Sequence, residues 1–323
     1  MSKSIMIVGD LIIDETWQVE VTRLNPEAPV PTAELLGRHP QRTPGGAGFA
    51  AAWAASQGVD VHFVTTATKK NHQELLERGI KVYTPWNNCS LNVTKTRFIE
   101  QSSGYHLLRL DNDRLVHPPP TTPKNIIQCM EEAIKCCRID VCLLSDYAKG
   151  FFHDKVLWTD IITWLQANEI PTILDTRAKD IRIWSGWEQR PISHAWVKLN
   201  DKEYNQTIEV LDWKIVKNDG EWAIRNEVFS KLIITHGKKG AHSYEAIWPD
   251  VPNEEEGPDI LVENYTPTII TNIAPDPTGC GDIFDVSFIS AIGNGESTKN
   301  ALKYAVEIAT KYAFIQFKDK FNG

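Results

Sequence analysis

The chain has 323 residues, of which 42% are hydrophobic and 24% are charged, and its formal net charge at pH 7 is −8. This hydrophobic fraction is enough to bury a substantial core, which excludes a largely disordered chain. The acidic balance argues against broad binding to nucleic acids or anionic membranes, because both kinds of partner need a basic surface.

Strands and helices are predicted to alternate along most of the chain. Apolar runs predict strands at 5–8, 59–65, 80–83, 141–144, 171–174, 196–199, 232–235 and 269–273. Helical patterns and their stop signals predict helices at 44–56, 73–78, 126–137, 156–167, 281–292 and 299–317. Such alternation is typical of a mainly parallel sheet covered by helices on both faces.

Two regions break this alternation. Residues 15–40 and 93–112 are strand-like but have no helix after them, and the second region reads as a hairpin around Ser102-Ser103-Gly104. These regions predict a small antiparallel sheet beside the main one. We therefore expect one α/β domain over residues 1–323, with a lid formed by about 12–43 and 92–116.

The most informative segment is Asp276-Pro277-Thr278-Gly279-Cys280-Gly281-Asp282, between a predicted strand and a predicted helix. Two glycines around a small residue allow a tight turn that points successive N–H groups outward at a helix N-terminus, where anions bind. A carboxylate at this place suits a general base that takes a proton from a hydroxyl attacking a phosphoryl group. The alternative is that Asp282 only caps the helix.

Three further segments each have a functional and a structural interpretation. The glycines of Thr235-His236-Gly237-Lys238-Lys239-Gly240 allow either close approach to a nucleotide phosphate or a plain tight turn. Asn200 and Glu203 either organise a hydrated Mg²⁺ or form an ordinary capping box. Gly45-Gly46 either hold a substrate through their backbone or only start a helix.

Several kinds of site are not predicted because their motifs are absent. The chain has no GxxxxGK[S/T], no GxSxG and no HExxH sequence. Its six cysteines form no CxxC pair and no spacing typical of a metal site, so we expect a reduced compartment and no zinc held by the protein. Asp10 and Asp14 interrupt the N-terminal stretch where a signal peptide needs continuous apolar residues, and we therefore expect a cytoplasmic protein.

The order of these segments resembles the ribokinase-like (PfkB) family of sugar kinases over nearly the whole chain. The resemblance is carried by Gly9-Asp10, Gly45-Gly46, Asn200-x-x-Glu203, Thr235-x-Gly237-x-x-Gly240 and Asp276-x-Thr278-Gly279-x-Gly281-Asp282. Within the family, the run from Arg23 to Pro31 (RLNPEAPVP) and the segments 94–97, 108–111 and 144–150 are most similar to the heptose-7-phosphate kinases.

The resemblance implies a three-layer α/β/α domain with a β-sheet lid, and a reaction that uses ATP and Mg²⁺. It implies that Asp282 is the catalytic base and that the backbone of Gly279, Cys280 and Gly281 forms the anion hole. The implied nucleotide-binding residues are Asn200, Glu203, Thr235, Gly237 and Gly240, with Asn200 and Glu203 acting on Mg²⁺ through water rather than as direct ligands. The implied substrate-binding residues are Asp10, Asp14, Gly45 and Gly46 for the sugar, and Arg97, Arg109 and Lys149 for its phosphate.

The acceptor implied by the resemblance is the anomeric hydroxyl of D-glycero-D-manno-heptose 7-phosphate. The match covers the kinase region only, so we expect a separate enzyme to carry out nucleotidyl transfer. We expect a homodimer formed through the lid, no nucleic-acid or membrane partner, and leave open a dependence on K⁺. Phe49 stands where the family usually has an Asn that binds a sugar hydroxyl. The alternatives are therefore a kinase for a different sugar, or a non-catalytic relative that binds sugar or nucleotide.

Overall fold

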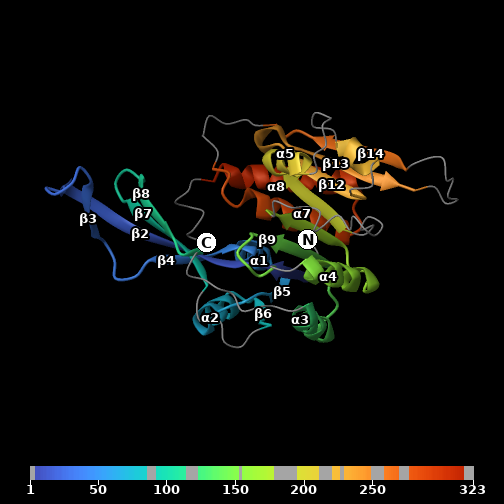
Figure 1. The fold of residues 1–323 in the computed structure, drawn as a ribbon, viewed down its shortest axis with the longest axis horizontal. Helices are drawn as coiled ribbons and strands as arrows, with labels where there is room; N and C mark the ends of the chain where they lie inside the picture. The colour runs from blue at the N-terminus through green and yellow to red at the C-terminus, as the bar shows by residue number, and fades with distance from the viewer. Residues whose placement is uncertain are drawn as a thin grey trace.

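The computed structural model describes residues 4–85, 92–113, 123–152, 155–177, 195–210, 220–225, 229–248, 258–268 and 276–315. Within these ranges the strands form two sheets of different size, here called sheet A and sheet B (Figure 1). Sheet A lies in the main body of the molecule, and sheet B projects from one side of it. No helix within these ranges is both long and apolar enough to cross a membrane.

Sheet A is a nine-stranded, mainly parallel sheet with the order β14-β13-β12-β11-β10-β9-β1-β5-β6. Its strands are β1 Ser4–Gly9, β5 Asp60–Val64, β6 Lys81–Tyr83, β9 Val141–Asp146, β10 Thr172–Thr176, β11 Ala195–Asn200, β12 Lys231–Thr235, β13 Ala241–Ile247 and β14 Asp259–Tyr265. Its antiparallel pairs, β12 with β13 and β13 with β14, lie at one edge. Every residue of β1 and β9 is buried, as expected for parallel strands covered on both faces.

Helices cover both faces of sheet A. The helices are α1 Ala47–Ser56, α2 Lys69–Glu77, α3 Pro123–Cys136, α4 Lys155–Ala167, α5 Asp201–Val210, α6 Gly220–Arg225, α7 Cys280–Gly293 and α8 Thr298–Ala313. One buried apolar cluster joins the sheet to α1, α2, α7 and α8, and the other joins it to α3, α4, α5 and α6. The predicted three-layer α/β/α architecture is confirmed.

Sheet B differs from the prediction in one respect, because it is mixed rather than antiparallel. It contains β2 Leu11–Leu24, β3 Pro31–Leu35, β4 Gln41–Gly46, β7 Val93–Glu100 and β8 His106–Asp111. The strands β2 and β7 pair parallel, whereas β3, β4 and β8 pair antiparallel with their neighbours. The turn signals in the sequence reveal only strands joined by short loops. The parallel pair arises because β2 follows β1 and β7 follows β6. Both strands therefore begin at the carboxyl end of the parallel strands of sheet A and run in the same direction.

Most predicted elements have the expected type, with shifted ends. Helix α2 begins at Lys69 rather than at Gln73, because the Thr68 side chain accepts a hydrogen bond from the N–H of Asn71 and caps an earlier turn. This first turn is polar and therefore has no apolar periodicity to reveal it. The predicted strand at 269–273 lies outside the described residues.

Candidate active site

A cavity of about 830 Å³ opens where the carboxyl ends of the parallel strands of sheet A face sheet B. Its walls come from the ends of β10, β11 and β12, from the start of α7, from α8 and from strands of sheet B. Ligands of open α/β sheets generally bind outside the carboxyl ends of the strands. The place and size of the cavity therefore suit a small-molecule site.

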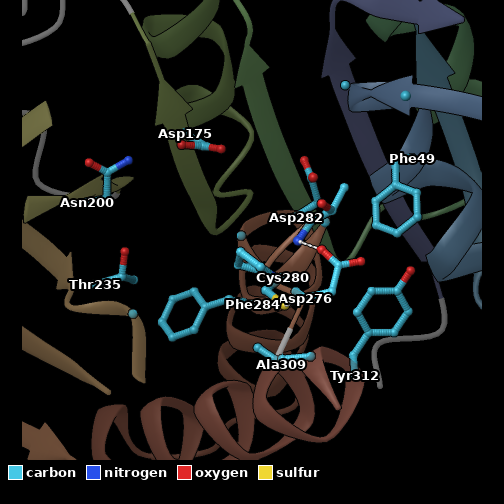
Figure 2. A pocket seen from close by; sticks show the side chains of 18 of the residues that line it. Phe49, Asp175, Asn200, Thr235, Asp276, Cys280, Asp282, Phe284, Ala309 and Tyr312 are labelled. Atoms are coloured by element: carbon cyan, nitrogen blue, oxygen red, sulfur yellow. Dashed lines mark hydrogen bonds between the residues drawn. The ribbon is translucent and has the colours of Figure 1, made fainter. Parts of the chain in front are cut away.

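Most of the residues singled out in the sequence line this cavity. They are Asp14, Gly45, Gly46, Arg97, Asn200, Glu203, Thr235, Gly237, Gly240, Gly279, Cys280, Gly281 and Asp282. Figure 2 shows Asp282 and Cys280 near the middle of the site, with Asn200 and Thr235 on one side and Phe49 and Tyr312 on the other. Asp10, Arg109 and Lys149 are not among the lining residues.

The start of α7 provides the amides of the predicted anion hole. Gly279 precedes the helix with a φ of 80°, a left-handed conformation that favours glycine. The N–H groups of Gly281 and Asp282 lie in the first turn, where no carbonyl of the helix can accept from them. The N–H of Cys280, by contrast, donates to the carbonyl of Pro277 at 3.1 Å. The amides that the turn offers to an anion are therefore centred on the start of the helix rather than on Cys280.

The Asp282 carboxylate lies beside these amides and is only 5% exposed. Burial and the negative charge of Asp175 raise the pKa of Asp282 to about 6, although the Tyr147 hydroxyl and two nearby cations lower it. The Tyr147 hydroxyl donates to Asp282 Oδ1 at 2.7 Å. At neutral pH this carboxylate is ionised, and it is a stronger base than an ordinary aspartate.

Lys198 is a buried cation of the site that the sequence motifs do not single out. Its Nζ lies 2.9 Å from Asp175 Oδ1 and 3.2 Å from Asp285 Oδ2. Burial lowers the pKa of Lys198, but the two carboxylates raise it above its ordinary value, so the ammonium stays charged. A Cβ placed on Gly281 would be 3.5 Å from Nζ, so this charge lies next to the anion-binding turn. The signal in the sequence is a lysine inside the otherwise apolar strand 196–199.

Asp10 is not a lining residue of the cavity, and its carboxylate holds a loop. Its carboxylate accepts hydrogen bonds from the N–H groups of Tyr147 at 2.8 Å, Phe151 at 3.0 Å and Lys149 at 3.2 Å. The reason is the strand order: β1 and β9 are neighbours, so the residue after β1 lies beside the loop after β9. This loop carries Tyr147 to Asp282. In this structure the Asp10 carboxylate therefore holds the loop that supports Asp282, and its contact with substrate stays a prediction.

Arg109 and Lys149, which are predicted to contact a phosphate, also lie outside the cavity wall. The guanidinium of Arg109 is half exposed and donates twice to Asp111, at 2.7 and 2.6 Å. The ammonium of Lys149 forms an ion pair with Asp113. Each of these two side chains is therefore paired with a carboxylate close in the fold.

The cavity is lined on the sheet B side by the predicted Arg97 and, in addition, by Lys95. Lys95 and Arg97 stand two residues apart on β7, which directs both side chains to the same face of sheet B. Arg97 forms an ion pair with Asp14 on the neighbouring strand β2. Arg177, after β10, places its guanidinium 4.0 Å from the centre of the Tyr147 ring. The period-two spacing of Lys95 and Arg97 is the signal that reveals this cationic face.

Phe49 packs directly against the turn before α7. A Cβ on Gly279 would lie 2.4 Å from Phe49 Cε1, so only glycine leaves room for the ring. The ring centre of Tyr312 is 6.1 Å from that of Phe49, and the two rings form an apolar wall beside the anion-binding turn (Figure 2).

The comparison with protein families agrees with this geometry. The family described as pfkB family carbohydrate kinase matches residues 2–312. The chain belongs to this family. Among curated proteins, the kinase is 26% identical to the bifunctional protein HldE of Aliivibrio fischeri (strain ATCC 700601 / ES114) over 319 residues, which are 96% of this chain and 59% of that protein. It is 31% identical to the bifunctional protein HldE of Koribacter versatilis (strain Ellin345) over 248 residues, 74% of this chain and 48% of that protein.

The kinase thus spans less than two thirds of the length of these curated relatives. Solved structures share its fold over nearly the whole chain. The tetrameric inhibited form of phosphofructokinase-2 from Escherichia coli superposes with a TM-score of 0.68 and 15% identity, covering 99% of this chain and 97% of that one. Arabidopsis thaliana ribokinase complexed with ribose and ATP superposes with a TM-score of 0.62 and 16% identity, covering 98% of this chain and 94% of that one. The kinase therefore has the ribokinase-like fold, and its family identifies it as an ATP-dependent carbohydrate kinase.

The cavity of the kinase contains side-chain oxygens that could act as ligands for a hydrated Mg²⁺. Asn200 and Glu203 form a reciprocal capping box, in which each side chain accepts the N–H of the other at 2.9 Å. The capping box, which is the purely structural interpretation of this pair, is therefore present. Both residues also line the cavity, together with Asp175. Burial and the charge of Asp175 raise the pKa of Glu203, so a cation here would be stabilised by both carboxylates. Mg²⁺ prefers oxygen ligands and keeps several of its waters, which suits this set.

Proposed function

We propose that this kinase transfers the γ-phosphoryl group of ATP to the anomeric hydroxyl of D-glycero-D-manno-heptose 7-phosphate. The observation that carries the proposal is a buried base, Asp282, in a cavity with two separate groups of cations. One group, Lys198 and Arg177, belongs to sheet A, and the other, Lys95 and Arg97, belongs to sheet B. When ATP reacts with a sugar phosphate, negative charge must be neutralised at two places, the triphosphate of ATP and the phosphate of the sugar, and each cation group is suited to one of them.

The electrostatics of Lys95 support a phosphate at the sheet B end. Burial lowers the pKa of Lys95, Asp14 raises it, and the positive charges of Arg109, Lys149 and Arg177 lower it further. The positive charges of Arg109 and Lys149 therefore influence Lys95 in the cavity wall, although these two residues do not line the cavity. A phosphate dianion would relieve this crowding of positive charge, whereas a neutral sugar would not.

The transfer step uses groups already described. The acceptor hydroxyl gives its proton to Asp282, and its oxygen forms a bond to the γ-phosphorus while the bond to the β–γ bridging oxygen breaks and ADP leaves. The amides at the start of α7 and the Lys198 ammonium stabilise the negative charge that builds on the moving phosphoryl group. Mg²⁺, held through water near Asp175 and Glu203, would neutralise charge on the phosphates of ATP.

We assign the nucleotide to the side of the cavity formed by Thr235, Gly237 and Gly240. Gly240 has a φ of 94°, and a Cβ on it would lie 1.9 Å from the carbonyl oxygen of Tyr265, so this loop requires glycine. A Cβ on Gly237 would meet no atom within 4 Å, which leaves its backbone open to a ligand. A requirement for K⁺ stays a prediction.

A second candidate function is a kinase for a different sugar or sugar phosphate. The packing of Phe49 against Gly279 favours it, because this ring removes a hydrogen-bonding position next to the anion-binding turn. The heptose assignment is supported by the resemblance of residues 23–31 and 94–97 to heptose kinases.

The test is the release of ADP with a panel of acceptors: heptose 7-phosphate, free heptose, fructose 6-phosphate and ribose. We expect the highest kcat/KM with heptose 7-phosphate, and a product with phosphorus NMR signals for an anomeric and a terminal phosphate. A higher kcat/KM with another sugar would establish the second candidate. Binding of ATP and sugar without ADP release from any acceptor would contradict catalysis.

We further propose that a second copy of the chain covers the outer part of sheet B. Large apolar side chains are exposed there, namely Val21, Leu24, Val30, Leu35, Leu108 and Leu110. The tip of the sheet also carries the 23–31 segment that resembles heptose kinases. We expect a dimer in analytical ultracentrifugation that Leu108→Glu dissociates. A monomeric wild-type kinase would contradict this proposal.

A further inference from the structure

A second cluster of polar side chains lies at the amino ends of the parallel strands of sheet A, opposite the active site. Asp60 and His62 are the first and third residues of β5, so their side chains point to the same face of the sheet. Cys137 follows directly after the last residue of α3, which packs on this face beside β5 and β6 (Figure 1). In the strand register Asp60 pairs with Ser4, the first residue of β1, whereas the cavity is at the other end of these strands.

His62 has no role in phosphoryl transfer and yet is completely buried in the core. A buried imidazole is costly unless its nitrogens have partners. Its Nε2 lies 3.1 Å from Cys137 Sγ and 3.4 Å from Asp60 Oδ2. Its Nδ1 lies 2.9 Å from the Tyr83 hydroxyl, and the two rings stack.

The Cys137 sulfur and the Asp60 carboxylate both approach the same nitrogen of His62. In a cysteine–histidine–aspartate relay, the thiol and the carboxylate bind opposite nitrogens of the ring. Here both contact the same nitrogen, and the sulfur, nitrogen and oxygen atoms all lie within 4.8 Å of one another. The opposite nitrogen is held by Tyr83, as the outer nitrogen of a metal-binding histidine is commonly held by a second partner.

We propose that Asp60, His62 and Cys137 bind a Zn²⁺ ion, with water in the fourth position. Sulfur, imidazole nitrogen and carboxylate oxygen are the ligands of protein-bound zinc, at roughly 2.0 to 2.3 Å from the ion. Tetrahedral bonds of these lengths place neighbouring ligand atoms roughly 3.3 to 3.6 Å apart, close to the 3.1 and 3.4 Å separations around His62. On binding, the Cys137 thiol gives its proton to solvent and the sulfur bonds to the ion.

The spacing of these residues in the sequence does not predict this site, because β5 and the end of α3 meet only in the folded chain. Lys81 is the competing cation: its Nζ lies 2.8 Å from Asp60 Oδ2. Both side chains are partly exposed, 48% for Lys81 and 38% for Asp60, so the lysine can turn into water. A thiolate and a carboxylate together neutralise Zn²⁺, and the site then needs no lysine. The ion would link β5 to the end of α3 and stabilise the fold without taking part in catalysis.

The test titrates the full chain, first stripped by a chelator, with Zn²⁺ in competition with a chromophoric chelator, and with Co²⁺ as a spectroscopic probe. We expect one equivalent to bind, a charge-transfer band from thiolate to Co²⁺, and a higher Tm with Zn²⁺. Cys137→Ser should remove the band and weaken Zn²⁺ binding by about 100-fold or more. Cys129→Ala, which changes a buried cysteine of α3 outside the cluster, should change neither.

A second variant separates a metal site from a merely well-bonded buried histidine. Lys81→Gln removes the cation that competes for Asp60, so it should tighten Zn²⁺ binding about 10-fold. Kinase turnover serves as the measure of correct folding for all variants, since the cluster lies away from the active site. Wild-type protein that binds Zn²⁺ no better than Cys137→Ser, or Lys81→Gln without tighter binding, would overturn the proposal.

Discussion

The two ends of the active-site cavity are built in different ways. At the sheet A end, the groups suited to phosphoryl transfer are backbone amides at the start of α7 and the buried charges of Asp282 and Lys198. At the sheet B end, the wall is made of single side chains on half-buried strands, such as Arg97 on β7, and of the Phe49 ring. A helix start and the buried ion pairs of Lys198 with Asp175 and Asp285 tolerate little change, whereas side chains on a strand can be exchanged singly. We therefore expect the first end to indicate the reaction and the second end to determine the acceptor.

The largest expected effect comes from the sheet A end. Asp282→Asn should lower kcat by about 1,000-fold or more, on the order of 4 kcal/mol, because an amide cannot take the proton of the acceptor hydroxyl. The KM for ATP should change little. Asp259→Asn, an exposed change on the edge strand β14, is the control and should keep full activity. Normal turnover of the Asp282 variant in a steady-state assay would contradict its assignment as the base.

The next effect tests the sheet B end. Arg97→Met should raise the KM for a phosphorylated acceptor by about 10- to 100-fold, because a charge-assisted hydrogen bond to the phosphate is lost. The KM for ATP should stay the same. Arg109→Met should have a much smaller effect, since Arg109 is paired with Asp111 and lies outside the cavity wall. Equal effects of the two changes would show that sheet B adopts another arrangement when substrate binds.

The difference between the two ends also explains what the sequence can predict. The segment 276–282 predicts the anion-binding turn and the base, because glycine spacing and a helix start are local features. The ion pair of Arg109 with Asp111, two residues along β8, is also a local feature, and the spacing of the two charges could have revealed it. The hydrogen bonds of Asp10 with the 147–151 loop could not be predicted, since they depend on how distant strands meet. The parallel pairing of β2 with β7 is hidden for the same reason.

The third effect concerns the acceptor. Phe49→Asn replaces the ring beside Gly279 with a shorter hydrogen-bonding side chain. We expect the ratio of kcat/KM values for two sugars that differ at one hydroxyl to change by about 10-fold, the size expected when one hydrogen bond to a substrate is gained. Phe49→Leu keeps an apolar side chain and serves as the control. An unchanged ratio in both variants would mean that the acceptor does not reach this wall.

The smallest effect is a shift in the pH profile, and it tests how the loop after β9 supports the base. Since the pKa of Asp282 is raised to about 6, kcat/KM should fall as the pH drops through this value and the carboxylate becomes protonated. The Tyr147 hydroxyl donates to Asp282 and lowers its pKa, so Tyr147→Phe should move the acidic limb to higher pH. At pH 6 this variant should be a few-fold less active than the wild type, whereas at pH 8 the two should be nearly equal. Asp10→Asn should shift the limb in the same direction, because it weakens the contacts that hold Tyr147 in place. An acidic limb that stays fixed in both variants would mean that another group limits the reaction at low pH.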